Sequence, residues 1–141
     1  MKVHEIMTQR PVCCLPETPL QEVAEMMLEN DCGEIPVVDD EQSMRPVGVV
    51  TDRDIVCRTI AEGRNPIEMN ARECMTRPAI TVSTETDLEE CLAALKRHQI
   101  RRIPVVNAEG ACCGIVAQAD IAKAAPREKT AELVRQVSQT R

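Results

Sequence analysis

The chain has 141 residues, of which 43% are hydrophobic and 28% are charged, and its formal net charge is −6 at pH 7. This balance is typical of a compact globular domain and not of a disordered chain. The acidic charge argues against a general nucleic-acid-binding protein, because a phosphate backbone requires a basic surface. The sequence has no apolar run long enough to span a membrane and no apolar stretch at its start like that of a signal peptide, so we expect a cytoplasmic protein without a membrane partner.

An internal repeat organises the sequence. Residues 7–38 align without a gap with residues 75–106, and residues 48–55 align with residues 114–121. Such self-similarity indicates a structural unit that occurs twice. We therefore predict an α+β fold made of two β-α-β-β-α units. The predicted parts are a first repeat at 1–63, a polar linker at 64–73, a second repeat at 74–126 and a C-terminal tail, expected to be helical, at 127–141.

Each repeat starts with a short β-prone run, at 11–15 or 79–82, followed by a predicted helix. Thr18 and Thr86 are each followed by Gln or Glu three residues later, which predicts capping boxes at the two helix starts. Pro19 is expected at the first helical position. Apolar residues at helical spacing predict the buried faces. These faces comprise Leu20, Val23, Ala24, Met27 and Leu28 in the first helix and Leu88, Cys91, Leu92 and Leu95 in the second.

Two further apolar runs follow in each repeat, with polar turn residues between them. This pattern predicts a hairpin, or neighbouring strands of one small sheet. A helix then closes each repeat and is ended by Gly63 in the first and by Pro126 in the second. The runs and closing helices are expected at 35–38, 47–50 and 52–62 in the first repeat and at 103–106, 114–116 and 118–125 in the second.

The eight cysteines raise the question of a metal or disulfide framework. Cys13 is adjacent to Cys14 and Cys112 to Cys113, and neighbours on a strand point to opposite faces, which makes them poor ligands for one metal. We therefore expect the cysteines to be small buried hydrophobes in a reducing compartment, and we expect no metal site. Because Phe, Trp and Tyr are absent, any bound base would lie between aliphatic side chains.

Three motifs recur in the two repeats: M-T at the start, then I-P-V-V, then G-h-V-T-x-x-D-I, where h is apolar and the second copy reads GIVAQADI. Together these motifs resemble a pair of cystathionine β-synthase (CBS) domains, a Bateman module. The resemblance covers residues 3–125 and includes no catalytic domain. It implies two repeats packed with pseudo-two-fold symmetry, a homodimer, and two clefts for AMP, ADP, ATP, S-adenosylmethionine or NAD-like ligands.

The resemblance implies a first cleft that combines the T-x-x-D residues of the first repeat with the first strand and the residues before I-P-V of the second. Asp54 suits a ribose, because a carboxylate accepts hydrogen bonds from both vicinal hydroxyls. Thr51 starts a helix whose free N–H groups favour a phosphate. Arg101 and Arg102 are expected to bind phosphate oxygens. The adenine is expected between Val49, Ile80 and Ile100, and Ala79 and Thr81 complete the set.

The second cleft is predicted to be weaker. Ala117 replaces the threonine, and Gly33 and Glu34 stand where the other cleft has two arginines. A carboxylate facing a triphosphate is repulsive. We therefore predict one occupied site per chain, with the second cleft empty or suited to a less anionic adenosyl ligand. The residues assigned to this second cleft are Asp120, Val12, Cys13, Cys14 and Gly33.

Plainer interpretations of the same residues remain open. Thr51 and Asp54 also fit an N-cap with an acid in the first helical turn, which stabilises a helix without ligand. Arg101 and Arg102 alternate on a strand, so one or both could simply face solvent.

The sequence favours a non-catalytic regulatory module that needs no cofactor, binds an adenosyl ligand and signals through an unidentified regulated protein. The alternative is a structural dimerisation or adaptor module with vestigial clefts. An enzyme is disfavoured, because no Ser/His/Asp or Cys/His pattern is visible and Cys57 is expected to point inward along its helix.

Overall fold

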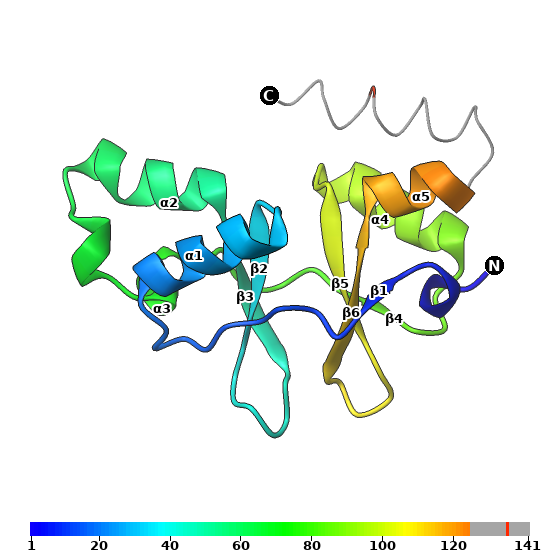
Figure 1. Ribbon diagram of the computed structural model, residues 1–141. Coiled ribbons are helices and arrows are strands. Elements are labelled where there is room, and N and C mark those ends of the chain that lie inside the picture. The colour runs from blue at the N-terminus through cyan, green and yellow to red at the C-terminus, as the bar shows by residue number, and fades with distance from the viewer. Residues whose placement is uncertain (125–134, 136–141) are drawn as a thin grey trace. The chain divides into compact units, whose positions relative to one another are not determined.

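The computed structural model describes residues 1–124 and Arg135, and its mixture of helices and strands confirms the α+β class (Figure 1). The chain forms two compact units. The continuous unit consists of residues 12–80, and the split unit joins residues 1–11 to the chain from residue 81 onward. The tail predicted at 127–141 lies outside the described residues except for Arg135.

Each unit contains most of one sequence repeat and a short segment from the other. The start of the chain joins the second repeat, because Thr8 and Gln9 form a strand beside β6 (Cys112–Ala117). In the same way, Thr76 pairs with Val49 of the first repeat. The two units are thus built from interchanged segments, while the repeat boundaries themselves stay a prediction.

The continuous unit is built on an antiparallel hairpin of β2 (Glu34–Val38) and β3 (Pro46–Thr51), which confirms the hairpin expected from the two apolar runs. Ile35 lies opposite Val50 in the register, and both side chains are fully buried. β-Branched residues of this kind pack well on a pleated surface. The helical elements of this unit are α1 (Leu20–Asn30), α2 (Asp52–Arg58), η2 (Ile60–Glu62), η3 (Pro66–Glu68) and α3 (Ala71–Cys74).

The core of the continuous unit includes one face of α1 and the hairpin. Leu20, Val23 and Met27 recur at helical spacing, and all three are buried. The segment 64–73, expected as a polar linker, adds Met69 to the same core. The amide of Leu20 also donates to the carbonyl of Met69 at 2.9 Å. This segment is therefore part of the folded unit, because Met69 packs in its core beside the start of α1.

The split unit contains a four-stranded sheet in the order β1-β6-β5-β4. β5 (Arg102–Val106) is antiparallel to β6, as predicted, and β4 (Val82–Ser83) is parallel to β5 at the edge of the sheet. Ile103, Leu95 and Ile121 are fully buried. The remaining elements of this unit are η1 (Val3–Glu5), β1 (Thr8–Gln9), α4 (Leu88–His98) and α5 (Gln118–Ala124).

Both predicted capping boxes before the first helix of each repeat are wrong. The hydroxyl oxygen of Thr18 accepts the amide hydrogen of Leu15 at 2.9 Å, and that of Thr86 accepts the amide hydrogen of Ser83 at 3.0 Å. Each threonine therefore closes the turn before the helix. Pro19 occupies the N-cap position and not the first helical position. A threonine hydroxyl can accept an amide hydrogen either within a turn or at the start of a helix, and both of these threonines bond within the turn.

Two helices also differ from the sequence expectation. Ala24 and Leu28 are exposed, Leu28 to 83%, because only a narrow face of α1 contacts the core. The closing helix of the first repeat ends at Arg58, since Thr59 departs from helical geometry and its hydroxyl bonds to a carbonyl one turn earlier. A 3-10 turn then leads to Gly63, which ends it with a φ of 73°. In the described part of the chain, no helix has both the length and the apolarity to cross a membrane.

Candidate ligand-binding site

The T-x-x-D motif of the first repeat lies where β3 ends and α2 begins. The hydroxyl oxygen of Thr51 accepts the amide hydrogen of Asp54 at 3.0 Å, and Oδ2 of Asp54 accepts the amide hydrogen of Thr51 at 3.0 Å. This reciprocal pair is a capping box, which stabilises the short helix without any ligand. The structural interpretation of the motif is thus confirmed, and ligand binding by Asp54 stays a prediction.

The carboxylate of Asp54 also contacts Thr76, beyond the helix, and Arg58 at the end of α2. The hydroxyl of Thr76 donates to Oδ1 and Oδ2 at 3.1 and 3.2 Å. Nε of Arg58 lies 3.6 Å from Oδ1, and the Asp54 side chain is only 13% exposed. Arg58 further donates to the carbonyl of Met75 at 3.2 Å and to the Thr76 hydroxyl at 3.3 Å. Asp54 is therefore held in place by a hydroxyl and has a positive charge beside it.

Sequence reasoning did not assign Thr76 or Arg58 to the site. Thr76 belongs to the M-T motif that opens the second repeat. This motif was used as evidence for the repeat and not as part of a binding site. Arg58 follows Asp54 by four residues, a spacing that brings two helical side chains together.

The start of α2 does not offer a phosphate site of the kind predicted at Thr51. The amide of Asp52 donates to the carbonyl of Gly33 at 2.9 Å, and the amide of Arg53 donates to Oδ1 of Asp52 at 2.8 Å. The next amide, that of Asp54, bonds to the Thr51 hydroxyl. These three N–H groups at the start of α2 are already used within the protein, and the helix has only seven residues. The prediction of free N–H groups at this helix start is therefore wrong.

The second T-x-x-D position is simpler. Asp120 accepts the amide hydrogen of Ala117 at 2.8 Å, which is half of the same capping box. Ala117 has no hydroxyl to return the bond, and Ala124 stands where the first repeat has Arg58. The amide of the intervening Gln118 donates to a backbone carbonyl at 2.9 Å. The two carboxylates thus differ in the groups around them, and the weaker binding expected of the second cleft stays a prediction.

The residues predicted for the first cleft are divided between the two units. The continuous unit brings Val49, Thr51 and Asp54 together at the end of β3, and the amide of Val49 donates to the carbonyl of Thr76 at 2.9 Å. Arg101 is exposed and its carbonyl accepts the hydrogen bond from Gln118. The cleft as a whole draws on both units and stays a prediction. Of the other members, Ala79 and Ile80 are half-buried in the continuous unit, whereas exposed Thr81 and half-buried Ile100 and Arg102 belong to the split unit.

The second set is divided as well, with Asp120 in the split unit and the others in the continuous unit. Cys14 is buried, and burial followed by the nearby charge of Glu22 raises the pKa of its thiol to about 12. A Cβ on Gly33 would lie 3.0 Å from a carboxylate oxygen of Asp52, so glycine leaves room for that side chain. The remaining members, Val12 and Cys13, are half-buried.

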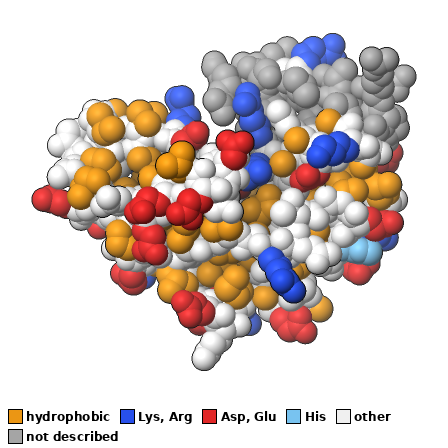
Figure 2. Space-filling model, in the orientation of Figure 1, with side chains coloured by type: hydrophobic (Ala, Val, Ile, Leu, Met, Phe, Trp, Pro, Cys, Tyr) orange, Lys and Arg blue, Asp and Glu red, His pale blue; other side chains and the backbone are white. Residues whose placement is uncertain are grey.

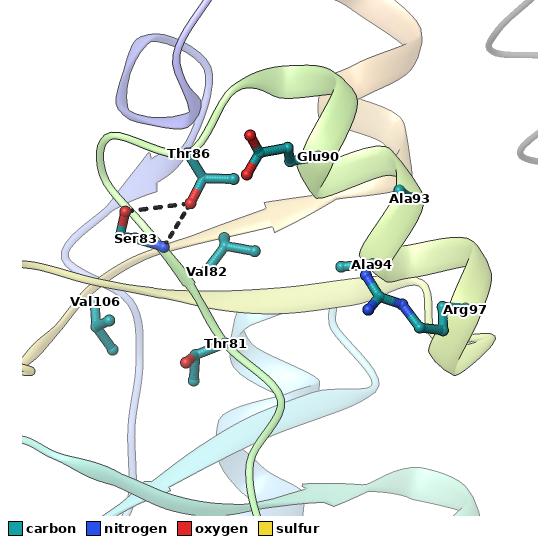
Figure 3. A pocket seen from close by; sticks show the side chains of 9 residues that line it. All are labelled: Thr81, Val82, Ser83, Thr86, Glu90, Ala93, Ala94, Arg97 and Val106. Atoms are coloured by element: carbon teal, nitrogen blue, oxygen red, sulfur yellow. Dashed lines mark hydrogen bonds between the residues drawn. The ribbon is translucent and has the colours of Figure 1, made fainter.

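A pocket of about 500 Å³ lies between β4 and α4 of the split unit (Figure 3). Glu90 lies beside Thr86 at one end, and the guanidinium of Arg97 lies beside Ala94 at the other (Figure 3). Hydroxyl groups and opposite charges make this pocket polar and close to neutral, so it offers no strong site for a polyphosphate. Thr81 is the one member of the first predicted cleft that lines it. The full lining is Thr81, Val82, Ser83, Thr86, Glu90, Ala93, Ala94, Arg97 and Val106.

Four of the eight cysteines are buried, as expected for small hydrophobes, whereas three are half-buried and Cys57 is exposed. Burial raises the pKa of Cys91 to about 11, and burial with the nearby charge of Asp54 raises that of Cys74 to about 11. A protonated thiol is a poor nucleophile and a poor metal ligand. Cys57 is exposed, so the expectation that it points inward is wrong. Among the described residues, no three His, Cys, Asp or Glu side chains gather in a way that could hold a metal ion.

Comparison with known proteins identifies related chains. Hypoxic response protein 1 of Mycobacterium tuberculosis is 32% identical over 134 residues, covering 95% of this chain and 92% of that protein. An uncharacterized protein of Methanopyrus kandleri is 31% identical over 126 residues, covering 89% of this chain. This chain covers 63% of that second relative, or less than two thirds of its length.

Solved structures show the same fold. The crystal structure of Hypoxic Response Protein I with two coordinated zinc ions has a TM-score of 0.81 and 32% identity, covering 89% of this chain and 100% of that one. The crystal structure of CBSX2 in complex with AMP has a TM-score of 0.76 and 29% identity, covering 88% of this chain and 95% of that one. The side chains described here do not fit a zinc site, because no suitable group of three ligands is present among them.

The family model for the CBS domain matches the chain twice, at residues 3–58 and 71–127. The two matches follow the two sequence repeats and together span most of the chain. The chain belongs to the CBS domain family.

Proposed function

We propose that this protein is a non-catalytic sensor whose Asp54 binds the ribose of an adenosyl ligand, with AMP, ADP or ATP preferred over S-adenosylmethionine or NAD. The observation that carries the proposal is the fixed carboxylate of Asp54, oriented by Thr51 at the end of β3 and placed next to Arg58. A carboxylate held in this way accepts hydrogen bonds from two vicinal hydroxyls. CBSX2, a structural relative at 29% identity, was solved in complex with AMP.

In this proposal, arginine side chains bind the phosphate groups of the ligand. Since the first amides of α2 have partners, Arg101 and Arg102 take the phosphate oxygens by charge-assisted hydrogen bonds. At the matching positions the first repeat has Gly33 and Glu34, and Glu34 is only 8% exposed. A buried carboxylate there disfavours a polyphosphate, which supports one ligand per chain.

A thermal-shift panel tests the proposal. AMP, ATP, S-adenosylmethionine and NADH are added separately to the full chain and to Asp54→Asn, which keeps an oxygen to accept the Thr51 amide. We expect AMP to raise the melting temperature of the wild-type chain, since a ligand at 100 times its Kd stabilises by about 2.7 kcal/mol. The shift should be much smaller for Asp54→Asn. If none of the four compounds stabilises the wild-type chain, the proposal is wrong.

A structural adaptor with vestigial clefts is the second candidate function. One observation favours it: the contacts of Asp54 with Thr51, Thr76 and Arg58 already satisfy the carboxylate without a ligand. An adaptor would keep a constant oligomeric state in light scattering, with or without nucleotide, and Arg101→Ala would change nothing.

We also propose that the protein is a homodimer that signals to a separate regulated protein. Large hydrophobic side chains of the continuous unit are exposed, and Figure 2 shows hydrophobic side chains among charged ones over α1 and α2. Light scattering on the wild-type chain and on Leu28→Glu tests this, with Glu25→Lys on the same helix as the control. A monomeric wild-type chain would contradict it. The exposed residues are Leu28, Val56, Ile60 and Ile67.

A further inference from the structure

We infer that Thr76 is a ligand-sensitive latch: a ribose bound to Asp54 displaces the Thr76 hydroxyl and so loosens the segment that leads from the continuous unit to the split unit. This inference rests on the proposed function and adds to it the way in which binding is converted into a signal. Every contact that supports it lies within the continuous unit.

Most acceptor positions on the Asp54 carboxylate are already used. A carboxylate has about four lone-pair positions. The Thr51 amide uses one on Oδ2, the Thr76 hydroxyl is shared between both oxygens, and Arg58 lies 3.6 Å from Oδ1. With the side chain 13% exposed, little free surface is left for two ribose hydroxyls.

Of the three partners of the Asp54 carboxylate, Thr76 is the one that a bound ribose can displace. The Thr51 amide belongs to the capping box and is fixed by the backbone of α2. Arg58 is held by bonds to the Met75 carbonyl at 3.2 Å and to the Thr76 hydroxyl at 3.3 Å, and its Nε lies 3.6 Å from the carboxylate. Thr76 is exposed, contributes a single hydroxyl, and occupies both oxygens that a vicinal diol requires. Thr76 is therefore the partner that a ribose replaces.

Thr76 also pairs with β3 through its backbone, close to the end of the continuous unit. The backbone of Thr76 pairs with Val49 of β3 through bonds of 2.9 and 2.8 Å, an isolated bridge in which Thr76 itself belongs to no strand. Only four residues separate Thr76 from the end of the continuous unit at Ile80. Such a short bridge opens more easily than a full strand pair, because few hydrogen bonds hold it. Loss of the hydroxyl contact therefore increases the freedom of the segment that leads from Thr76 to the end of the continuous unit.

The repeat supplies a matched comparison. Thr8 aligns with Thr76 and pairs with Ile115 in β6, just as Thr76 pairs with Val49 in β3. Ala124, however, replaces Arg58 in the second repeat. Among the described residues, the latch with its arginine thus occurs beside the carboxylate proposed to bind ribose and not at the matching position of the second repeat.

Two measurements on the full chain test the latch, with AMP as the probe. The first is calorimetric affinity for the wild-type chain, Thr76→Val, Thr76→Ser and Thr8→Val. Because Thr76→Val removes the competing hydroxyl, AMP should bind about tenfold more tightly, which corresponds to about 1.4 kcal/mol. Thr76→Ser keeps a hydroxyl and Thr8→Val lies in the other repeat, so both should bind AMP like the wild-type chain.

The second measurement is amide hydrogen exchange of the segment 75–80 in the wild-type chain, which needs no variant. AMP should increase exchange there while it slows exchange around α2. If AMP binds to the wild-type chain and depends on Asp54, but exchange at 75–80 does not rise and Thr76→Val binds with unchanged affinity, the latch is wrong and the sensor remains. If AMP binds to none of these proteins, the proposed function itself fails and the latch with it.

Discussion

The hydroxyl of Thr76 donates to both carboxylate oxygens of Asp54, at 3.1 and 3.2 Å, and so connects two positions that are 22 residues apart in the chain. The bond joins the M-T motif that opens one repeat to the T-x-x-D motif that closes the other. These two family motifs are therefore parts of one local structure. A change at either residue is expected to be felt at the other.

Removal of the N-cap hydroxyl should destabilise the continuous unit. In Thr51→Ala the amide of Asp54 loses its acceptor, and we expect a loss of about 1 kcal/mol in the free energy of unfolding, measured by urea denaturation. The converse change, Ala117→Thr, supplies the missing hydroxyl beside Asp120 and should stabilise the chain by a few tenths to about 1 kcal/mol. Equal stability of wild type and Thr51→Ala would show that the capping box contributes nothing.

Gly48 allows a close approach of the segment that contains Thr76. A Cβ at this position would lie 2.8 Å from the Thr76 carbonyl oxygen and 2.9 Å from Sδ of Met75. Because backbone must move to make room, Gly48→Ala should cost about 1 to 3 kcal/mol in thermal or urea unfolding. At the matching Gly114 the closest atom is the flexible Sδ of Met7, so Gly114→Ala should cost less. The reverse order of the two costs would contradict this account of the bridge.

High pH should destabilise the protein through its buried thiols. Burial raises the pKa of Cys14 to about 12 and that of Cys91 to about 11, from an ordinary value of 9.0. Above pH 9 the unfolded chain loses these protons while the folded chain keeps them, so the free energy of unfolding falls as pH rises. Each thiol contributes in full below pH 9, and its contribution decreases by about 1.4 kcal/mol per pH unit until its folded pKa is reached.

Urea denaturation at a series of pH values between 8 and 11 measures this slope. Cys91→Ala should reduce the slope, even though the lost side chain lowers stability at every pH. Cys57 is exposed, so Cys57→Ser is the control and should leave the slope unchanged. If stability were constant from pH 9 to 11, the thiols would not be shielded as the structure indicates.

The sequence predicted the parts of the fold that depend on local patterns. Apolar runs around Ile35 and Val50 marked the hairpin, and the spacing of Leu20, Val23 and Met27 marked the buried face of α1. The same spacing overstated that face, because Leu28 extends an apolar stripe on a helix whose contact with the core is narrow. Periodicity reports the direction of a side chain and not the width of the surface that covers it.

The site was less predictable for a different reason. Thr51 and Asp54 are close in sequence, so their motif was visible, but the contact between Asp54 and Thr76 exists only because the start of the second repeat folds back onto β3. A threonine also has several possible partners. Thr18 fitted a capping box as well as Thr51 did, yet it bonds to Leu15 in the preceding turn. Only the folded backbone decides between such alternatives.

Isothermal titration of the full chain with AMP tests the central claim most directly, with Asp54→Asn and Asp120→Asn as the two variants. We predict one AMP per chain, an affinity at least about tenfold lower in Asp54→Asn because a hydrogen bond to a charged group is lost, and little change in Asp120→Asn. Two equivalent sites per chain, or a loss of binding in Asp120→Asn and not in Asp54→Asn, would contradict the proposed single site at Asp54.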